Sequence, residues 1–196
     1  MGWGSGEAEQ KRRPPLRRPF AFLRCEMSVV FFLIMVLLPA LLLAASAWDL
    51  ASFTIPNGIQ VALLAGFAAF VFASHMSAAV FGGHLLAGFL GLVIGFSLFA
   101  LGYIGGGDAK LFACVCLWFG MHDLLLYALI ASIFGGGLTL LLLTMRQLPL
   151  PAALSGQNWL LRLHDARQGI PYGVALASGA FCILPQAEIF RAAFGV

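Results

Sequence analysis

Long apolar runs, separated by short polar or glycine-rich breaks, dominate this chain of 196 residues. A helix needs about 20 consecutive apolar residues to cross a bilayer core, and several of the runs approach that length. We therefore predict an all-α, polytopic membrane protein with about six transmembrane helices. The expected spans cover residues 29–47, 59–74, 85–101, 109–119, 124–143 and 169–184.

The fourth and fifth spans come from one long stretch. Asp108 to Leu143 is 36 residues, which is too long for one ordinary crossing. The polar residues His122 and Asp123 follow Gly120 and interrupt the apolar pattern, so we expect two helices, and whether the shorter one crosses fully stays open. In the third span small residues recur every four positions and predict a face for close helix packing: Gly83, Ala87, Gly91 and Gly95.

The first 26 residues are polar and basic, and we expect no stable fold there. Residues 27–196 are then the membrane domain. The same start also resembles a secretory signal, with an apolar run and then Ala45-Ser46-Ala47 as an alternative cleavage site. Met27 directly precedes the first apolar run and would be a natural start of the working protein.

Charge gives two conflicting orientations. Six of the eleven Lys and Arg residues precede the first span, and the positive-inside rule would hold that end in the cytoplasm. Among the later charges, Arg191 alone lies on the same side as the chain start. A start at Met27 resolves the conflict, because four basic residues then favour the opposite orientation: Lys110, Arg146, Arg162 and Arg167.

Composition agrees with a membrane protein. Hydrophobic residues make up 61% of the chain, mean hydropathy is +0.97, and only 10% of residues are charged, against roughly 25% in soluble domains. The four cysteines form no CxxC pair, and the four histidines lie near predicted span ends without a metal-binding spacing. We interpret the histidines as interfacial, and we expect no metal, no other cofactor and no nucleic-acid partner.

Candidate chemistry lies in the stretch Gly105-Gly106-Gly107-Asp108-Ala109-Lys110. Ionisable groups between long apolar runs are costly and suggest function. The three glycines let the backbone turn sharply and approach another segment closely. Asp108 could equally be an ordinary N-cap that begins the next helix, and Lys110 could pair with Asp108 or with lipid phosphate.

Asp49 is a second acidic residue in an unusual place, where the first helix should end. It could be an ordinary solvated loop residue. With alternating spans, however, the end of span one and the start of span four fall on the same membrane face, so Asp49 and Asp108 can meet. The long loop and the start of span six fall on that face too.

Two carboxylates in one site can share a proton. The ionised one would activate a water, while the protonated one would hydrogen-bond the scissile carbonyl and protonate the leaving amine. Asp108 at a helix N-terminus is the better candidate for the ionised partner, and Asp49 at a helix C-terminus for the protonated one. The pair titrates as a unit, so this assignment is a hypothesis.

These residues also carry a resemblance. Gly105-Gly106-Gly107-Asp108 contains G-x-G-D, which resembles the mark of membrane-embedded aspartic proteases. Asp49, followed six residues later by Ile55-Pro56-Asn57, looks like the other half of the type IV prepilin peptidase pattern. With Ile170-Pro171-Tyr172-Gly173 further on, the chain is similar to the short members that serve Flp-type (tight adherence) pili. The resemblance covers about residues 27–184.

The resemblance implies a prepilin leader peptidase that cuts off a basic leader, usually after glycine, at the cytoplasmic face of the bacterial inner membrane. It implies Asp49 and Asp108 as the catalytic pair, with Gly105, Gly107 and Lys110 as active-site support. Prepilin or pseudopilin substrates and membrane lipid would be the partners. Larger members carry a soluble domain with two CxxC pairs and N-methylate the trimmed pilin, and we expect no such activity here.

One departure leaves substrate selection open. Related chains tend to have basic residues between the first Asp and Ile-Pro, whereas residues 51–54 here are Ala, Ser, Phe and Thr. The alternatives are a small transporter or channel in which the two aspartates bind a proton or cation, or an inactive scaffold subunit of a secretion machine. The prepilin that is cut, its cleavage sequence and the oligomeric state stay open.

Overall fold

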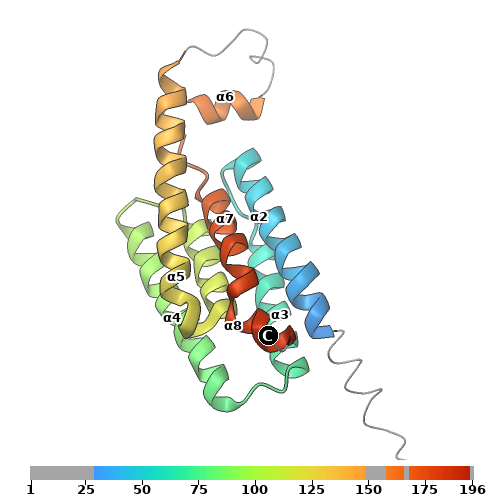
Figure 1. Ribbon diagram of the computed structural model, residues 1–196. Coiled ribbons are helices and arrows are strands. Elements are labelled where there is room, and N and C mark those ends of the chain that lie inside the picture. Colours follow the sequence, from blue (N-terminus) through green and yellow to red (C-terminus); the bar gives the residue numbers. More distant parts are fainter. Residues whose placement is uncertain (1–28, 149–157, 166–167, 195–196) are drawn as a thin grey trace, which may run out of the picture.

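The computed structural model describes residues 29–148, 158–165 and 168–194 (Figure 1). The predicted basic extension, the start at Met27 and Arg167 lie outside these residues. The elements run in the order η2 (Leu33–Leu37), α2 (Leu38–Ser52), α3 (Asn57–Ala73), α4 (Ala78–Ala100), α5 (Gly106–Gln147), α6 (Asn158–His164), α7 (Tyr172–Ile183), η4 (Leu184–Gln186) and α8 (Glu188–Phe194).

The described part of the chain consists of helices joined by short connections and contains no strand, which confirms the all-α prediction. Three helices are long and apolar enough to cross a membrane: Val29–Ser52, Ala78–Ala100 and Gly106–Gln147. The apolar helices Asn57–Ala73 and Tyr172–Gln186 are shorter. The protein is therefore an all-α membrane protein, with a helical segment at each predicted position.

The first apolar helix, Val29–Ser52, continues through Pro39. Residues Leu33–Leu37 form a π-helical turn, in which the Leu38 N–H donates to Leu33 O. A proline removes one backbone donor from a helix, and here a locally wider turn precedes it. The helix then runs on to Ser52, so Asp49 lies inside the last turn and not beyond the helix end.

α5 is two antiparallel arms joined at Gly120. Gly120 has φ +74° and ψ −176°, a conformation that glycine adopts at little cost. Along a straight helix Phe112 and Tyr127 would lie about 22 Å apart, yet their ring centroids are 5.4 Å apart. The second arm therefore folds back along the first (Figure 1), which confirms the two predicted helices.

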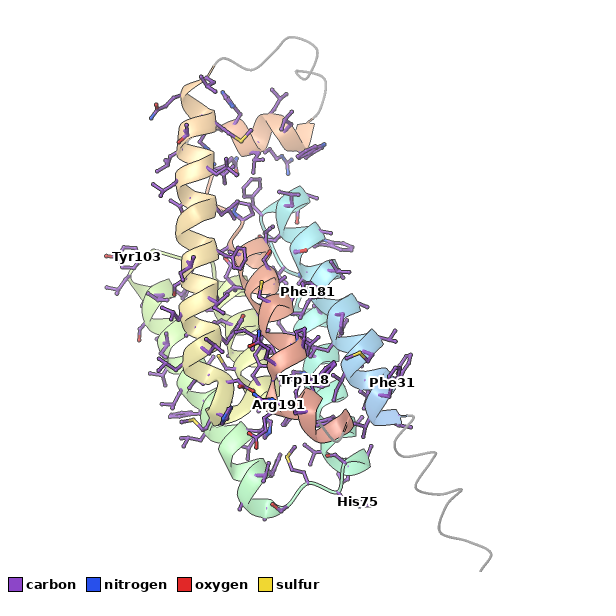
Figure 2. All side chains as sticks on the ribbon, viewed as in Figure 1. Phe31, His75, Tyr103, Trp118, Phe181 and Arg191 are labelled. Atoms are coloured by element: carbon purple, nitrogen blue, oxygen red, sulfur yellow. The ribbon has the colours of Figure 1, made fainter. Side chains whose placement is uncertain are left out.

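The first arm of α5, Gly106 to Phe119, is the centre of the fold. Nearly all of its side chains beyond Lys110 are buried, and the Trp118 Nε1–H donates to Leu63 O of α3 at 3.0 Å. Phe67 and Phe70 of α3 pack against the Trp118 ring, which Figure 2 places among the helices. Side chains on this first arm of α5 are therefore held in place by the neighbouring helices.

The small-residue face of α4 packs on this first arm as predicted. A Cβ at Gly91 would lie 2.8 Å from Cys116 Cβ, and one at Gly95 would lie 2.9 Å from Ala109 O. Gly83, by contrast, has no neighbour within 4 Å among the described residues. The close approach thus concerns the second half of α4, next to the start of α5.

Candidate active site

Asp49 lies in the last turn of α2 and is 3% exposed. Phe53 closes this helix in the left-handed conformation, with φ +55°, and its N–H donates to Asp49 O at 2.7 Å. The chain then turns through Ile55 and Pro56 into α3. The carboxylate is therefore fixed by a helix end and buried, which excludes the solvated loop residue.

Asp108 lies in the first turn of α5 and is 5% exposed. The helix begins at Gly106, two residues earlier than predicted, and Gly105 is its N-cap. The Gly105 N–H donates to Asp108 Oδ2 at 3.1 Å. Asp108 is thus not the N-cap itself. Its other oxygen, Oδ1, is buried and has no hydrogen-bond partner among the described residues.

The start of α7 brings the two aspartates together. The Gly173 N–H donates to Asp49 Oδ2 at 2.7 Å, and the Asp108 carboxylate interacts electrostatically with both Asp49 and the Gly173 amide. Asp49 and Asp108 therefore meet at one level, as the alternating topology predicts. Three elements that are far apart in the sequence, α2, α5 and α7, build this pair.

The helix ends no longer distinguish the two carboxylates. Asp49 faces the C-terminal end of its own helix, but it also accepts a hydrogen bond from the second residue of α7. Asp108 accepts one from the N-cap of α5. Each carboxylate thus lies at a helix N-terminus, where the dipole favours negative charge. The predicted division between an ionised Asp108 and a protonated Asp49 loses its physical basis.

Glycines let these segments approach closely. A Cβ at Gly173 would lie 2.8 Å from Asp49 Oδ2, and one at Gly107 would lie 3.2 Å from Ile55 Cβ. A Cβ at Gly105 would lie 3.0 Å from Asp108 Oδ2. The sharp turn before them is made by Gly102, with φ +77°. Gly105 and Gly107 therefore act through close approach and not through a left-handed turn.

Lys110 does not pair with Asp108, the protein partner that was considered for it, in the described residues. Its Nζ donates to Asn57 Oδ1 at 3.0 Å, and the side chain is exposed. Lys110 lies two residues after Asp108, so the two side chains leave the helix on roughly opposite sides. Lys110 links the start of α5 to the start of α3, so its connection to the carboxylate pair is indirect.

Asp108 also lines a cavity of about 490 Å³ between α4, the second arm of α5 and α7. The cavity is mainly apolar, and its polar lining includes Ser132, Thr139 and Tyr172. The Thr139 and Tyr172 hydroxyl oxygens lie 3.3 Å apart, within hydrogen-bond distance. No cluster of metal-binding side chains occurs in the described ranges.

The described residues of the long loop lie at the same end. α6 lies across the end of the second arm of α5 and near the end of α2 (Figure 1). Arg146, near the end of α5, connects to residues on either side of the loop's second half: its guanidinium donates to Leu163 O at 2.9 Å and to Gly169 O at 3.0 Å. The described residues of this loop thus include a short helix, α6 (Asn158–His164), near the end of α2 that carries Asp49.

A third buried aspartate, Asp123, lies at the opposite end. Its Oδ2 accepts the Glu188 N–H at 2.8 Å, and its Oδ1 lies 2.9 Å from His122 Nδ1. His84, expected at the interface, is buried, with its ring against Gly120 and Nδ1 2.8 Å from Leu117 O. Figure 2 labels His75 at this end and Tyr103 towards the other.

Reasoning from sequence missed two parts of the site. Gly173 belongs to the Ile170–Gly173 motif, but nothing in the sequence indicated that its N–H would bind Asp49. The cavity wall was also missed, because the sequence indicated no role at the site for Gly135 and Gly136, which line the cavity. The signal available was their place on the same helix face as Ser132 and Thr139.

Fold and site define an all-α membrane protein with two buried carboxylates held together from separate helices. The sequence profile of the type IV leader peptidase family matches residues 22–140, more than half of the chain, including both Asp49 and Asp108. The chain belongs to this family of peptidases. Neither the search of curated proteins nor the search of solved structures finds a match.

Proposed function

We propose that this protein is a membrane-embedded aspartic endopeptidase of the G-x-G-D type, which removes the basic leader from prepilin-like substrates of Flp-type pili. The observation that supports it best is the pair itself. Asp49 and Asp108 come from helices distant in sequence and lie buried together. Asp108 also lines a cavity, and its Oδ1 has no hydrogen-bond partner among the described residues. A buried polar atom without a partner is costly and calls for an explanation.

The chemistry needs no group beyond the two side chains. One carboxylate takes a proton from a water, whose oxygen attacks the scissile carbonyl carbon. The other carboxyl group donates a hydrogen bond to the carbonyl oxygen. When the tetrahedral intermediate collapses, the amide nitrogen takes a proton from the pair, the C–N bond breaks, and one shared proton stays on the two carboxylates. The Gly173 and Gly105 N–H groups hold the carboxylates in place through this cycle.

A cleavage assay tests this function. Purified protein in lipid vesicles is incubated with an Flp-type prepilin, and the product is identified by its mobility and by its new N-terminus. We expect loss of a basic leader, insensitivity to chelators, and no N-methylation of the product. A transporter or an inactive scaffold would leave the prepilin intact, and recovery of activity by added zinc after chelation would contradict an unassisted carboxylate mechanism.

We further propose that the carboxylate pair faces the cytoplasm of a bacterial inner membrane. The basic residues Lys110, Arg146 and Arg162 lie at that end of the described helices, against Arg191 at the other, which favours this orientation. A reporter fused after Arg162 should be cytoplasmic and one inserted at His75 periplasmic. The reverse pattern would overturn the orientation while leaving the chemistry intact.

A further inference from the structure

The cavity beside Asp108 has a regular wall. Along the second arm of α5 its lining residues recur at intervals of three and four positions, which is one face of a helix. The face holds Ala128, Ala131, Ser132, Gly135, Gly136 and Thr139. From Ala128 to Thr139 it extends for about 16 Å. Small side chains keep this face recessed, so the space beside it remains open.

The cavity connects the membrane-facing surface with the carboxylate. Ile94 on α4 is 43% exposed and Leu140 on α5 is 68% exposed, and both line the cavity. Phe112 and Ala131 line it as well, and both are buried. In a membrane protein such an exposed apolar surface faces lipid. The opening between α4 and the second arm therefore lies on the lipid side.

The chemistry of the lining selects its occupant. Asp108 is the one charged residue among the described residues that line the cavity. An apolar lining disfavours a basic segment, because a charge loses its hydration there. Asp108 itself lines the cavity, and its buried Oδ1, which has no hydrogen-bond partner among the described residues, still calls for a polar group close by. A peptide that is apolar in its side chains and has one backbone group beside Asp108 meets both requirements.

Resting on the proposed peptidase function, we propose that this cavity binds the first apolar residues of the prepilin that follow the cleavage point, and that Gly135 and Gly136 keep it open for them. A cylinder 10 Å wide and one helical turn long has a volume of about 420 Å³. The cavity, at about 490 Å³, therefore accommodates about one turn of substrate. The basic leader lies outside it.

Two neighbouring glycines give a matched test. Gly136 and Gly137 are both exposed, and at either position a Cβ would meet nothing within 4 Å in the described structure. Only Gly136 lines the cavity. Gly136→Leu should lower kcat/KM for prepilin cleavage by at least tenfold, mainly through KM, whereas Gly137→Leu should change it less than twofold. Equal activities of the two variants, as when a lipid chain fills the cavity, would overturn the proposal.

A trapping experiment gives a readout besides turnover. In an Asp108→Asn background with the native cysteines replaced, Gly136→Cys or Gly137→Cys is combined with a prepilin that carries one cysteine at the second residue after the cut. We expect a disulfide with position 136 and not with 137. If the unaltered protein cleaves and neither or both positions form the disulfide, the cavity assignment is wrong. If the unaltered protein does not cleave, the proposed function itself fails.

Discussion

The buried aspartates at the two ends of the molecule differ in their hydrogen bonding. At one end, which we call the dyad end, Asp49 and Asp108 share the neighbourhood of the Gly173 N–H, and Asp108 Oδ1 has no partner among the described residues. At the other, which we call the cap end, Asp123 has a partner for each oxygen, the Glu188 N–H and the His122 ring. All three carboxylates are equally buried.

Burial therefore does not distinguish Asp108, a proposed catalytic residue, from Asp123, whereas hydrogen bonding among the described residues does. A carboxylate with both oxygens paired has little free capacity for a substrate or a water. At the cap end it holds the start of α8 against the bend in α5. At the dyad end two carboxylates lie together, and one of their oxygens has no partner among the described residues, an arrangement that stability alone does not favour.

The largest expected effect is on activity at the dyad end. Asp49→Asn and Asp108→Asn should each lower prepilin cleavage by about 10³-fold or more, since either change removes a carboxyl group that must transfer a proton. Asp123→Asn is the matched control, because it also neutralises a buried carboxylate, and it should keep most of the activity. The rates are compared at equal amounts of protein in the membrane. Substantial cleavage by either dyad variant would contradict the assignment.

For stability we expect the opposite order, with the larger loss at the cap end and the smaller loss at the dyad end. Asp123→Ala leaves the Glu188 N–H without its partner and should lower the free energy of unfolding by about 1–3 kcal/mol, seen as a lower melting temperature in detergent. Asp108→Asn keeps an oxygen for the Gly105 N–H and should melt within a degree or two of the unaltered protein. If Asp108→Asn destabilises the protein more than Asp123→Ala does, the distinction between the two ends is wrong.

A smaller effect should follow from a methyl group at Gly173. Its Cβ would lie 2.8 Å from Asp49 Oδ2, so Gly173→Ala should displace that carboxylate and lower kcat by about 10- to 100-fold. Gly58 is the matched control, because it is also the second residue of a helix at the dyad end. A Cβ at Gly58 would meet nothing within 4 Å in the described structure. Gly58→Ala should cleave normally, and equal losses in both variants would show a general helix effect.

The smallest effect is expected at Lys110. Its hydrogen bond to Asn57 is exposed, and such surface contacts contribute little to stability. Lys110→Ala should therefore lower cleavage only a few-fold, and Asn57→Ala should have a similar effect because it removes the same contact. A loss as large as that of Asp108→Asn would place the ammonium in the chemistry itself.

The sequence predicted the positions of the helices and the meeting of Asp49 with Asp108, because apolar run lengths and alternating topology determine both. It could not predict contacts that depend on how the helices pack. The burial of His84 follows from the bend at Gly120, and the partner of Lys110 follows from the position of α3. The same holds for the helix dipole that acts on Asp49, because α7, whose N-terminus faces this carboxylate, lies more than 100 residues further along the chain.

The fold-back at Gly120 also determines the rotational phase of the cavity wall. Asp108 and Gly136 lie on the two arms of one hairpin, so their relative direction depends on the number of residues in between. Each residue of an α-helix turns by about 100°. One residue inserted after the bend would rotate Gly136 away from Asp108, whereas seven would nearly restore its direction. We therefore expect the number of residues between Gly120 and Gly136 to be constrained more strictly than the identity of their side chains.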